Sequence, residues 1–93
     1  MKTINLKEVL KDISGKEYTD KAELGSVLLY ALGQKKQNQA TEITDACHSL
    51  KKRMFKKEEI ELTNEEIKIL KDQVNYSTVS QDNYFAVVDL LEG

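Results

Sequence analysis

The sequence predicts a mainly α-helical protein, a compact small bundle of four to five short helices, with a small N-terminal β-hairpin as the alternative to its first helix. Apolar residues recur every third or fourth position along most of the chain, and pairs of helix-capping residues precede several of these stretches. Pro is absent, and only four Gly occur among 93 residues, so little interrupts a helix. At this length we expect a single domain, residues 1–93, with one hydrophobic core.

The N-terminal segment has two interpretations. Its apolar residues have helical spacing: Leu6, Val9, Leu10 and Ile13. Asn5 and Glu8 have the spacing of a capping box and Gly15 follows at the usual C-terminal position, which favours a helix over residues 5–14. The competing interpretation is a hairpin that turns at Ser14 and Gly15, with "KEVLKDI" and "KEYTD" as its strands. Apolar and polar residues alternate poorly in "KEVLKDI", so the helix is favoured.

A second helix is expected to begin at Asp20, with Glu23 completing a capping box, and to end at Gly33. Apolar residues cover nearly its whole circumference: Leu24, Val27, Leu28, Leu29, Tyr30, Ala31 and Leu32. Such a helix lies in the middle of a structure, covered by its own chain or by a second subunit. Gly25 would permit close approach of another helix.

The third helix is expected over residues 41–56, because its apolar residues form one narrow seam. The seam consists of Ile43, Cys47, Leu50 and Met54. The segment "EEIEL" that follows alternates charged and apolar residues, which predicts a short extended link with Ile60 and Leu62 turned inward.

The strongest local signal is "LTNEEI", which predicts the start of another helix. Thr63 is the expected N-cap, Glu66 completes the capping box, and Leu62 and Ile67 have the spacing of a hydrophobic staple. The expected buried side of this helix is Ile67, Leu70 and Val74, with Ile69 flanking it.

A last helix is expected after Ser80, which can cap it, with Asp82 in its first turn and Val79 and Tyr84 at staple spacing. Its expected face is Tyr84, Val87, Val88 and Leu91, with Phe85 and Leu90 at the margin.

Five of the fourteen basic residues fall within residues 51–57. They are Lys51, Lys52, Arg53, Lys56 and Lys57. With the apolar seam buried, Lys52 and Lys56 point away from the core, and cations at the end of a helix complement its dipole. Glu58 and Glu59 follow at once, and the formal net charge is −2, so a hydrated helix face is the favoured interpretation. The alternatives are the phosphate-binding patch of a small nucleic-acid-binding regulator and a site for an acidic protein partner.

Residue types for catalysis or metal binding are sparse. The single cysteine, Cys47, excludes an internal disulfide and multi-cysteine metal sites, and we expect it to be a buried small hydrophobe. His48 points elsewhere because adjacent helical residues diverge by about 100°. The glycines at positions 15, 25, 33 and 93 form no phosphate-binding loop. We therefore expect a protein that is not an enzyme and has no cofactor and no metal.

Exposed aromatic and large apolar residues are typical of protein interfaces, so the expected partner is another protein or a second copy of the chain. The candidate interface residues are Leu29, Tyr30, Phe55, Tyr76 and Phe85. Nucleic acid is the less favoured partner. Neither a signal peptide nor a run of about 18 apolar residues is present, so we expect a cytoplasmic protein without a membrane partner.

At "GSVLLYAL", "ELTNEEIKILKDQV" and "VVDLLEG" the chain resembles small accessory proteins of unknown role encoded by tailed phages and prophages. The matching residues are Leu28, Ala31 and Leu32; residues 61–67; and Leu90, Leu91 and Glu92. The resemblance as a whole covers about half the chain. The resemblance supplies no catalytic residue. It implies a phage accessory or assembly protein that works in the host cell cytoplasm by contact with other proteins.

Overall fold

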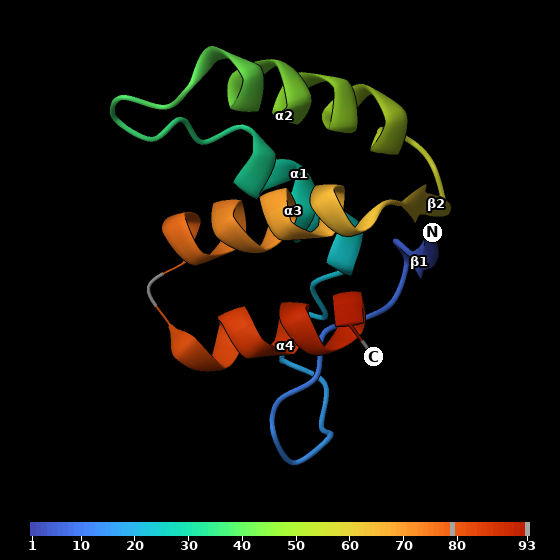
Figure 1. The fold of residues 1–93 in the computed structure, drawn as a ribbon. Helices are drawn as coiled ribbons and strands as arrows, with labels where there is room; N and C mark the ends of the chain where they lie inside the picture. The colour runs from blue at the N-terminus through green and yellow to red at the C-terminus, as the bar shows by residue number, and fades with distance from the viewer. Residues whose placement is uncertain (79, 93) are drawn as a thin grey trace.

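The structure, a computed structural model, describes residues 1–78 and 80–92 of the chain. Within these residues the chain forms four helices and two short strands (Figure 1). In chain order the elements are β1 (Lys2–Asn5), α1 (Leu24–Leu32), α2 (Thr41–Met54), β2 (Glu59–Leu62), α3 (Asn64–Ser77) and α4 (Gln81–Glu92). The predicted mainly α-helical small bundle is confirmed, with β-structure near the N-terminus as in the hairpin alternative.

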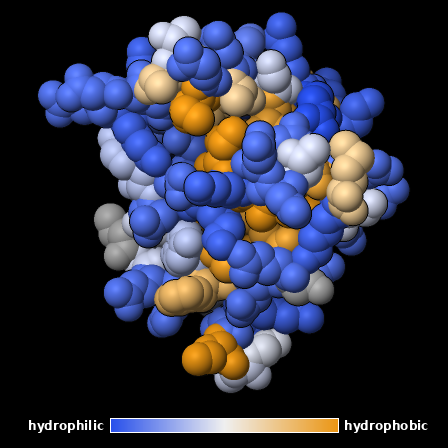
Figure 2. Space-filling model, in the orientation of Figure 1, coloured by the Kyte–Doolittle hydropathy of each residue, from blue (hydrophilic) through white to orange (hydrophobic). Residues whose placement is uncertain are grey.

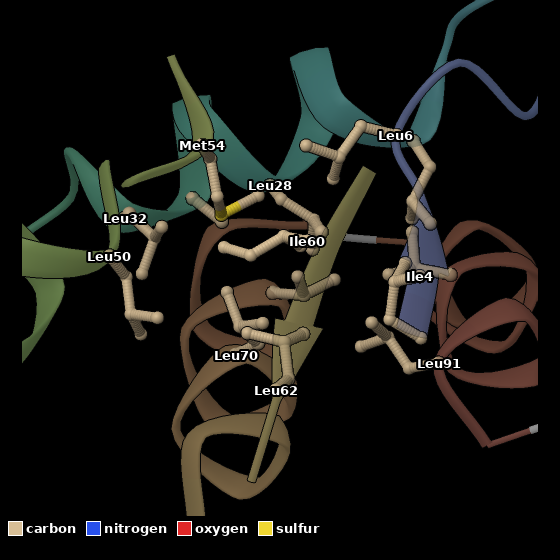
Figure 3. Close-up of a cluster of buried hydrophobic side chains, with 14 of the residues drawn as sticks. Ile4, Leu6, Leu28, Leu32, Leu50, Met54, Ile60, Leu62, Leu70 and Leu91 are labelled. Carbon is tan, nitrogen blue, oxygen red and sulfur yellow. The ribbon is translucent and has the colours of Figure 1, made fainter. Parts of the chain in front are cut away.

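Helix α1 lies behind α3, with α2 above them and α4 below in Figure 1. Strands β1 and β2 pair antiparallel, with Ile4 opposite Ile60. As Figure 3 shows, the buried core joins these elements: Leu28 and Leu32 of α1, Leu50 and Met54 of α2, Ile60 and Leu62 of β2, Leu70 of α3, Leu91 of α4, and Ile4 and Leu6 at the N-terminus.

The prediction of a helix over residues 5–14 is wrong. Residues 6–23, here called the arm, contain no helix, and two isolated bridges pair Val9 with Glu23 and Lys11 with Glu17. Side chains compete with helical hydrogen bonds here. The Asn5 carboxamide oxygen accepts from the Lys7 amide at 2.9 Å, and the Asp12 carboxylate accepts from the Ser14 and Lys16 amides. The competing interpretation, a hairpin that turns near Ser14 and Gly15, is closer to the observed arm.

Helix α1 begins at Leu24, four residues later than expected at Asp20, and ends at Gly33 as expected. The Asp20 carboxylate accepts from the Ala22 amide within the arm, at 3.2 Å. The amides that open α1 are instead bound by the arm: Leu24 donates to the Glu8 carbonyl and Gly25 to the Leu6 carbonyl, each at 2.8 Å. Contacts between segments distant in sequence therefore determine where this helix starts.

The chain itself covers most of α1. Its buried residues are Leu24, Gly25, Leu28, Ala31 and Leu32. The close approach expected at Gly25 is present, but the neighbour is the arm and not another helix. A Cβ at Gly25 would lie 2.9 Å from the Leu6 carbonyl oxygen and 3.1 Å from the Leu6 Cβ.

The remaining elements agree closely with expectation. Helix α2 ends at Met54, two residues early, with Cys47, Leu50 and Met54 buried and Ile43 partly buried. Ile60 and Leu62 turn inward from β2 as expected. The Ser80 hydroxyl accepts from the Asn83 amide at 3.3 Å, which caps α4. The staple expected between Val79 and Tyr84 involves Val79, which lies outside the described residues.

The capping box that opens α3 is confirmed. The Thr63 hydroxyl accepts from the Glu66 amide at 3.1 Å, and the Glu66 carboxylate accepts from the Thr63 amide at 2.9 Å. Glu66 also forms an ion pair with Arg53. Burial alone would raise the pKa of Glu66, but the Thr63 amide and the Arg53 guanidinium outweigh it and hold the pKa below its ordinary value.

Gln73 of α3 is a buried polar residue that sequence reasoning missed. Its side-chain amide donates to the Ala31 carbonyl at 3.1 Å and to the Gln34 carbonyl at 2.7 Å. Ala31 lies in the last turn of α1 and Gln34 two residues beyond its end, a region where backbone carbonyls lose their helical partners. Gln73 therefore ties α3 to the end of α1.

Replacing Gly25 with Ala should destabilise the protein by about 1–3 kcal/mol, because the added methyl group would displace the arm backbone at Leu6. The measurement is the free energy of unfolding in urea. Gly33→Ala is the matched control, since a Cβ there would meet no atom closer than 3.4 Å. Equal effects of the two changes would contradict the close approach of the arm to α1.

Glu66→Gln should lower the free energy of unfolding at neutral pH by about 0.5–1 kcal/mol, after allowance for solvent screening, because the amide keeps a capping oxygen but loses the charge that Arg53 stabilises. The folded-state pKa of Glu66 is depressed, so its contribution is present above the ordinary pKa of 4.5 and is lost as the pH falls through the folded value. Urea unfolding of both proteins at about pH 7 and about pH 3 should show the gap closing in acid. Glu65→Gln, on the exposed side of the same turn, is the control. A gap that persists in acid would show that the charge is not its cause.

Candidate functional site

Large exposed apolar side chains are the candidate contact points. Four of the five predicted interface residues are more than half exposed: Tyr30 at 64%, Phe55 at 60%, Tyr76 at 52% and Phe85 at 55%. The fifth, Leu29, is partly buried. The four aromatic residues lie on different elements, and Tyr30 and Phe85 line different hollows.

Ile13 is an exposed apolar residue that sequence reasoning missed. It was expected on the buried face of a first helix, but it lies in the turn of the arm and is 100% exposed. Ile13 and Phe85 together line a hollow of about 250 Å³ between the arm and α4, with Ala86 beside them. We call this hollow the notch.

Carboxylates surround the notch. Asp12, Asp82 and Asp89 line it together with one cation, Lys11. The Ser14 hydroxyl and the Lys16 amide donate to the Asp12 carboxylate and hold its pKa below the ordinary value, so Asp12 is ionised at neutral pH. Figure 2 shows an apolar group among hydrophilic residues at the lower end of the molecule, where Figure 1 places the arm. The notch is therefore an apolar site with a net negative rim.

A second groove, of about 530 Å³, lies between the arm, α1, and the adjoining ends of α3 and α4. Leu10, Val27, Val74 and Val87 give it apolar walls, and Tyr18 and Tyr30 also line it. The Tyr18 hydroxyl is buried and has no hydrogen-bond partner among the described residues. Thr78, at the C-terminal end of α3, also lines this groove.

The basic cluster lies at the C-terminal end of α2. Lys52, Lys56 and Lys57 are exposed, as expected for a hydrated surface, and Lys51 is partly buried. Arg53 is engaged within the chain, because its guanidinium pairs with Glu66 and also donates to the Glu61 carbonyl at 2.8 Å. Arg53 is itself exposed, so four of the five basic residues reach solvent, and one of these four is engaged by Glu66.

The turn after α2 carries Phe55 outward. Lys56 adopts a positive φ of 60°, a conformation uncommon for residues other than Gly, and its Nζ lies 5.5 Å from the centroid of the Phe55 ring. Lys56 and Lys57 also share a shallow hollow of about 90 Å³ with Lys7 and Leu29. An apolar ring and several lysines therefore lie together at this end.

Cys47 and His48 take the positions expected of them. Cys47 is buried at 4% exposure, and burial raises the pKa of its thiol although the charge of Lys36 acts in the opposite direction. His48 is exposed. A buried thiol with a raised pKa is a poor nucleophile.

The described residues, 1–78 and 80–92, contain no group of three His, Cys, Asp or Glu side chains arranged to hold a metal ion. Among the helices in these same residues, none is long and apolar enough to cross a bilayer.

Comparisons with known proteins identify no relative. No protein-family model matches the chain, and neither a curated protein nor a solved structure does. The similarity to phage accessory proteins remains a prediction.

Proposed function

We propose that this chain is a non-enzymatic protein-interaction module and that the notch is its docking surface. The observation that carries the proposal is the exposure of Ile13, at 100%, beside Phe85, at 55%, in one hollow with a carboxylate rim. Buried aromatic anchors surrounded by polar residues are the usual centre of a protein interface.

The apolar side chains supply the driving force. Removing apolar surface from water is worth about 25 cal/mol per Å², so a partner that covers Ile13 and Phe85 gains on the order of 1–3 kcal/mol from each. Phe85 is held by α4, and its ring packs edge-on against Tyr84 at 5.2 Å between centroids. A ring held in this way loses little conformational freedom on binding.

The rim specifies the partner's chemistry. Asp12, Asp82 and Asp89 outnumber Lys11, so the matching partner surface carries an apolar anchor flanked by Lys or Arg. Such charges orient the partner during encounter and exclude acidic surfaces.

The biological setting that we favour is a phage or prophage accessory or assembly protein acting in the host cytoplasm. Support comes from the resemblance at residues 61–67 and at the Leu90, Leu91 and Glu92 ending, together with a surface suited to protein contact.

The alternative, a nucleic-acid-binding regulator that uses Lys51, Lys52, Arg53, Lys56 and Lys57, has weaker support. The Arg53 guanidinium is already paired with Glu66, and Glu58 and Glu59 lie directly beyond the cluster. Proteins held by the phosphate backbone usually present basic residues from several elements.

The experiment is selection from a displayed random-peptide library on the wild-type protein and on an Ile13→Ser/Phe85→Ser variant. Peptides enriched on the wild type should combine a large apolar residue with neighbouring Lys or Arg. Their affinity for the variant should fall at least about tenfold, which corresponds to about 1.4 kcal/mol.

Tyr76→Ser is the matched control, because Tyr76 is 52% exposed but lies on α3, away from the notch. It should leave peptide binding unchanged. Failure to enrich any peptide, or equal binding to the wild type and the notch variant, would refute the notch as a docking surface.

A further inference from the structure

The surface that complements the notch is present on the same chain. Phe55 and the lysines Lys52, Lys56 and Lys57, here called the basic end, combine an exposed ring with exposed cations. These are the features that the notch requires of a partner. Figure 1 places α2 and the turn of the arm at opposite ends of the molecule, so the notch and the basic end lie apart within one copy.

We propose that the occupant of the notch is a second copy of this chain, whose basic end docks against Ile13 and Phe85. This inference rests on the proposed function and names the partner of the same site. The notch, at about 250 Å³, lies below the 300–1,000 Å³ typical of small-molecule pockets and suits a single inserted side chain such as the Phe55 ring.

The charges of the notch and of the basic end are complementary, including the few charges of the opposite sign at each surface. The two surfaces carry equal numbers of the opposite charges: Lys52, Lys56 and Lys57 at the basic end, and Asp12, Asp82 and Asp89 on the rim. The notch also contains one cation, Lys11, and the basic end is followed by two anions, Glu58 and Glu59. Lys11 of the notch would therefore have Glu58 or Glu59 of the other copy as a partner of opposite charge.

Because the two surfaces differ and lie at opposite ends, the contact is heterologous. One copy uses its notch and keeps a free basic end, so addition of copies continues unless the chain of subunits closes into a ring. Each surface offers few large apolar side chains, which predicts weak association that increases with protein concentration.

The test uses two variants of the full chain, each with one inactive end. Phe85→Ser/Asp89→Lys inactivates the notch without changing Asp12 or Asp82, which serve the arm turn and the first turn of α4. Lys52→Glu/Lys57→Glu inactivates the basic end without changing the positive-φ residue Lys56. Circular dichroism verifies that both variants fold.

Average mass is measured by sedimentation and light scattering over rising protein concentration. The wild type should gain mass with concentration and lose that gain in about 0.5 M NaCl, where screening shortens the range of exposed charges. Each variant alone should remain a monomer. An equimolar mixture of the two should form a heterodimer and nothing larger, because each variant retains the end that the other lacks.

A wild type that stays monomeric at every concentration, variants that still self-associate alone, or a mixture that does not associate would each overturn the second-copy proposal. If peptide selection still depends on Ile13 and Phe85 in that case, the notch remains a docking surface for another protein. If peptide binding is also independent of those residues, the proposed function fails with it.

Discussion

The backbone contact between the start of the arm and the first turn of α1 is the constraint on which the other features depend. The Leu6 amide donates to the Glu58 carbonyl at 2.7 Å, and the Leu6 carbonyl accepts from the Gly25 amide at 2.8 Å. One residue therefore connects the chain before β2 with the opening of α1. The absence of a side chain at Gly25 permits this close approach. The Leu6 carbonyl also accepts from an amide at the start of the helix, a role that a capping side chain usually fills.

The position of the notch follows from that contact. With its base held at Leu6 and Gly25, the arm extends away from the core and turns where Asp12 accepts three hydrogen bonds, from the Ser14 amide and hydroxyl and the Lys16 amide. Ile13 lies within this turn and cannot reach the core that Leu6 and Leu10 enter. Its exposure beside Phe85 is thus a consequence of backbone geometry. The Asp12 carboxylate shapes the turn and also contributes charge to the rim of the notch.

The sequence predicted most accurately the elements whose determinants lie within a few residues of each other. The Thr63 and Glu66 capping box and the alternation that buries Ile60 and Leu62 are local, and both are confirmed. The arm was mispredicted because its decisive partners, Gly25 and Glu58, are distant in sequence and its apolar spacing fits a helix equally well. The same error hid half of the candidate site: Phe85 was identified, but Ile13 was assigned to the core. Gln73 was missed because a polar residue between buried positions gives no sign of its distant acceptors.

The charges that distinguish the two ends of the molecule also stabilise the folded monomer. Lys52 lies in the last turn of α2 and Asp82 in the first turn of α4, where each complements the local helix dipole. Asp12 completes the arm turn, and Lys56 Nζ lies over the Phe55 ring. Asp12 and Lys56 thus have contacts within the folded monomer, which would reduce the ordering cost of the proposed association. The formal net charge is only −2, so repulsion between copies would be weak. The proposed attraction between a basic end and a notch would then act at short range, within the screening length of the salt.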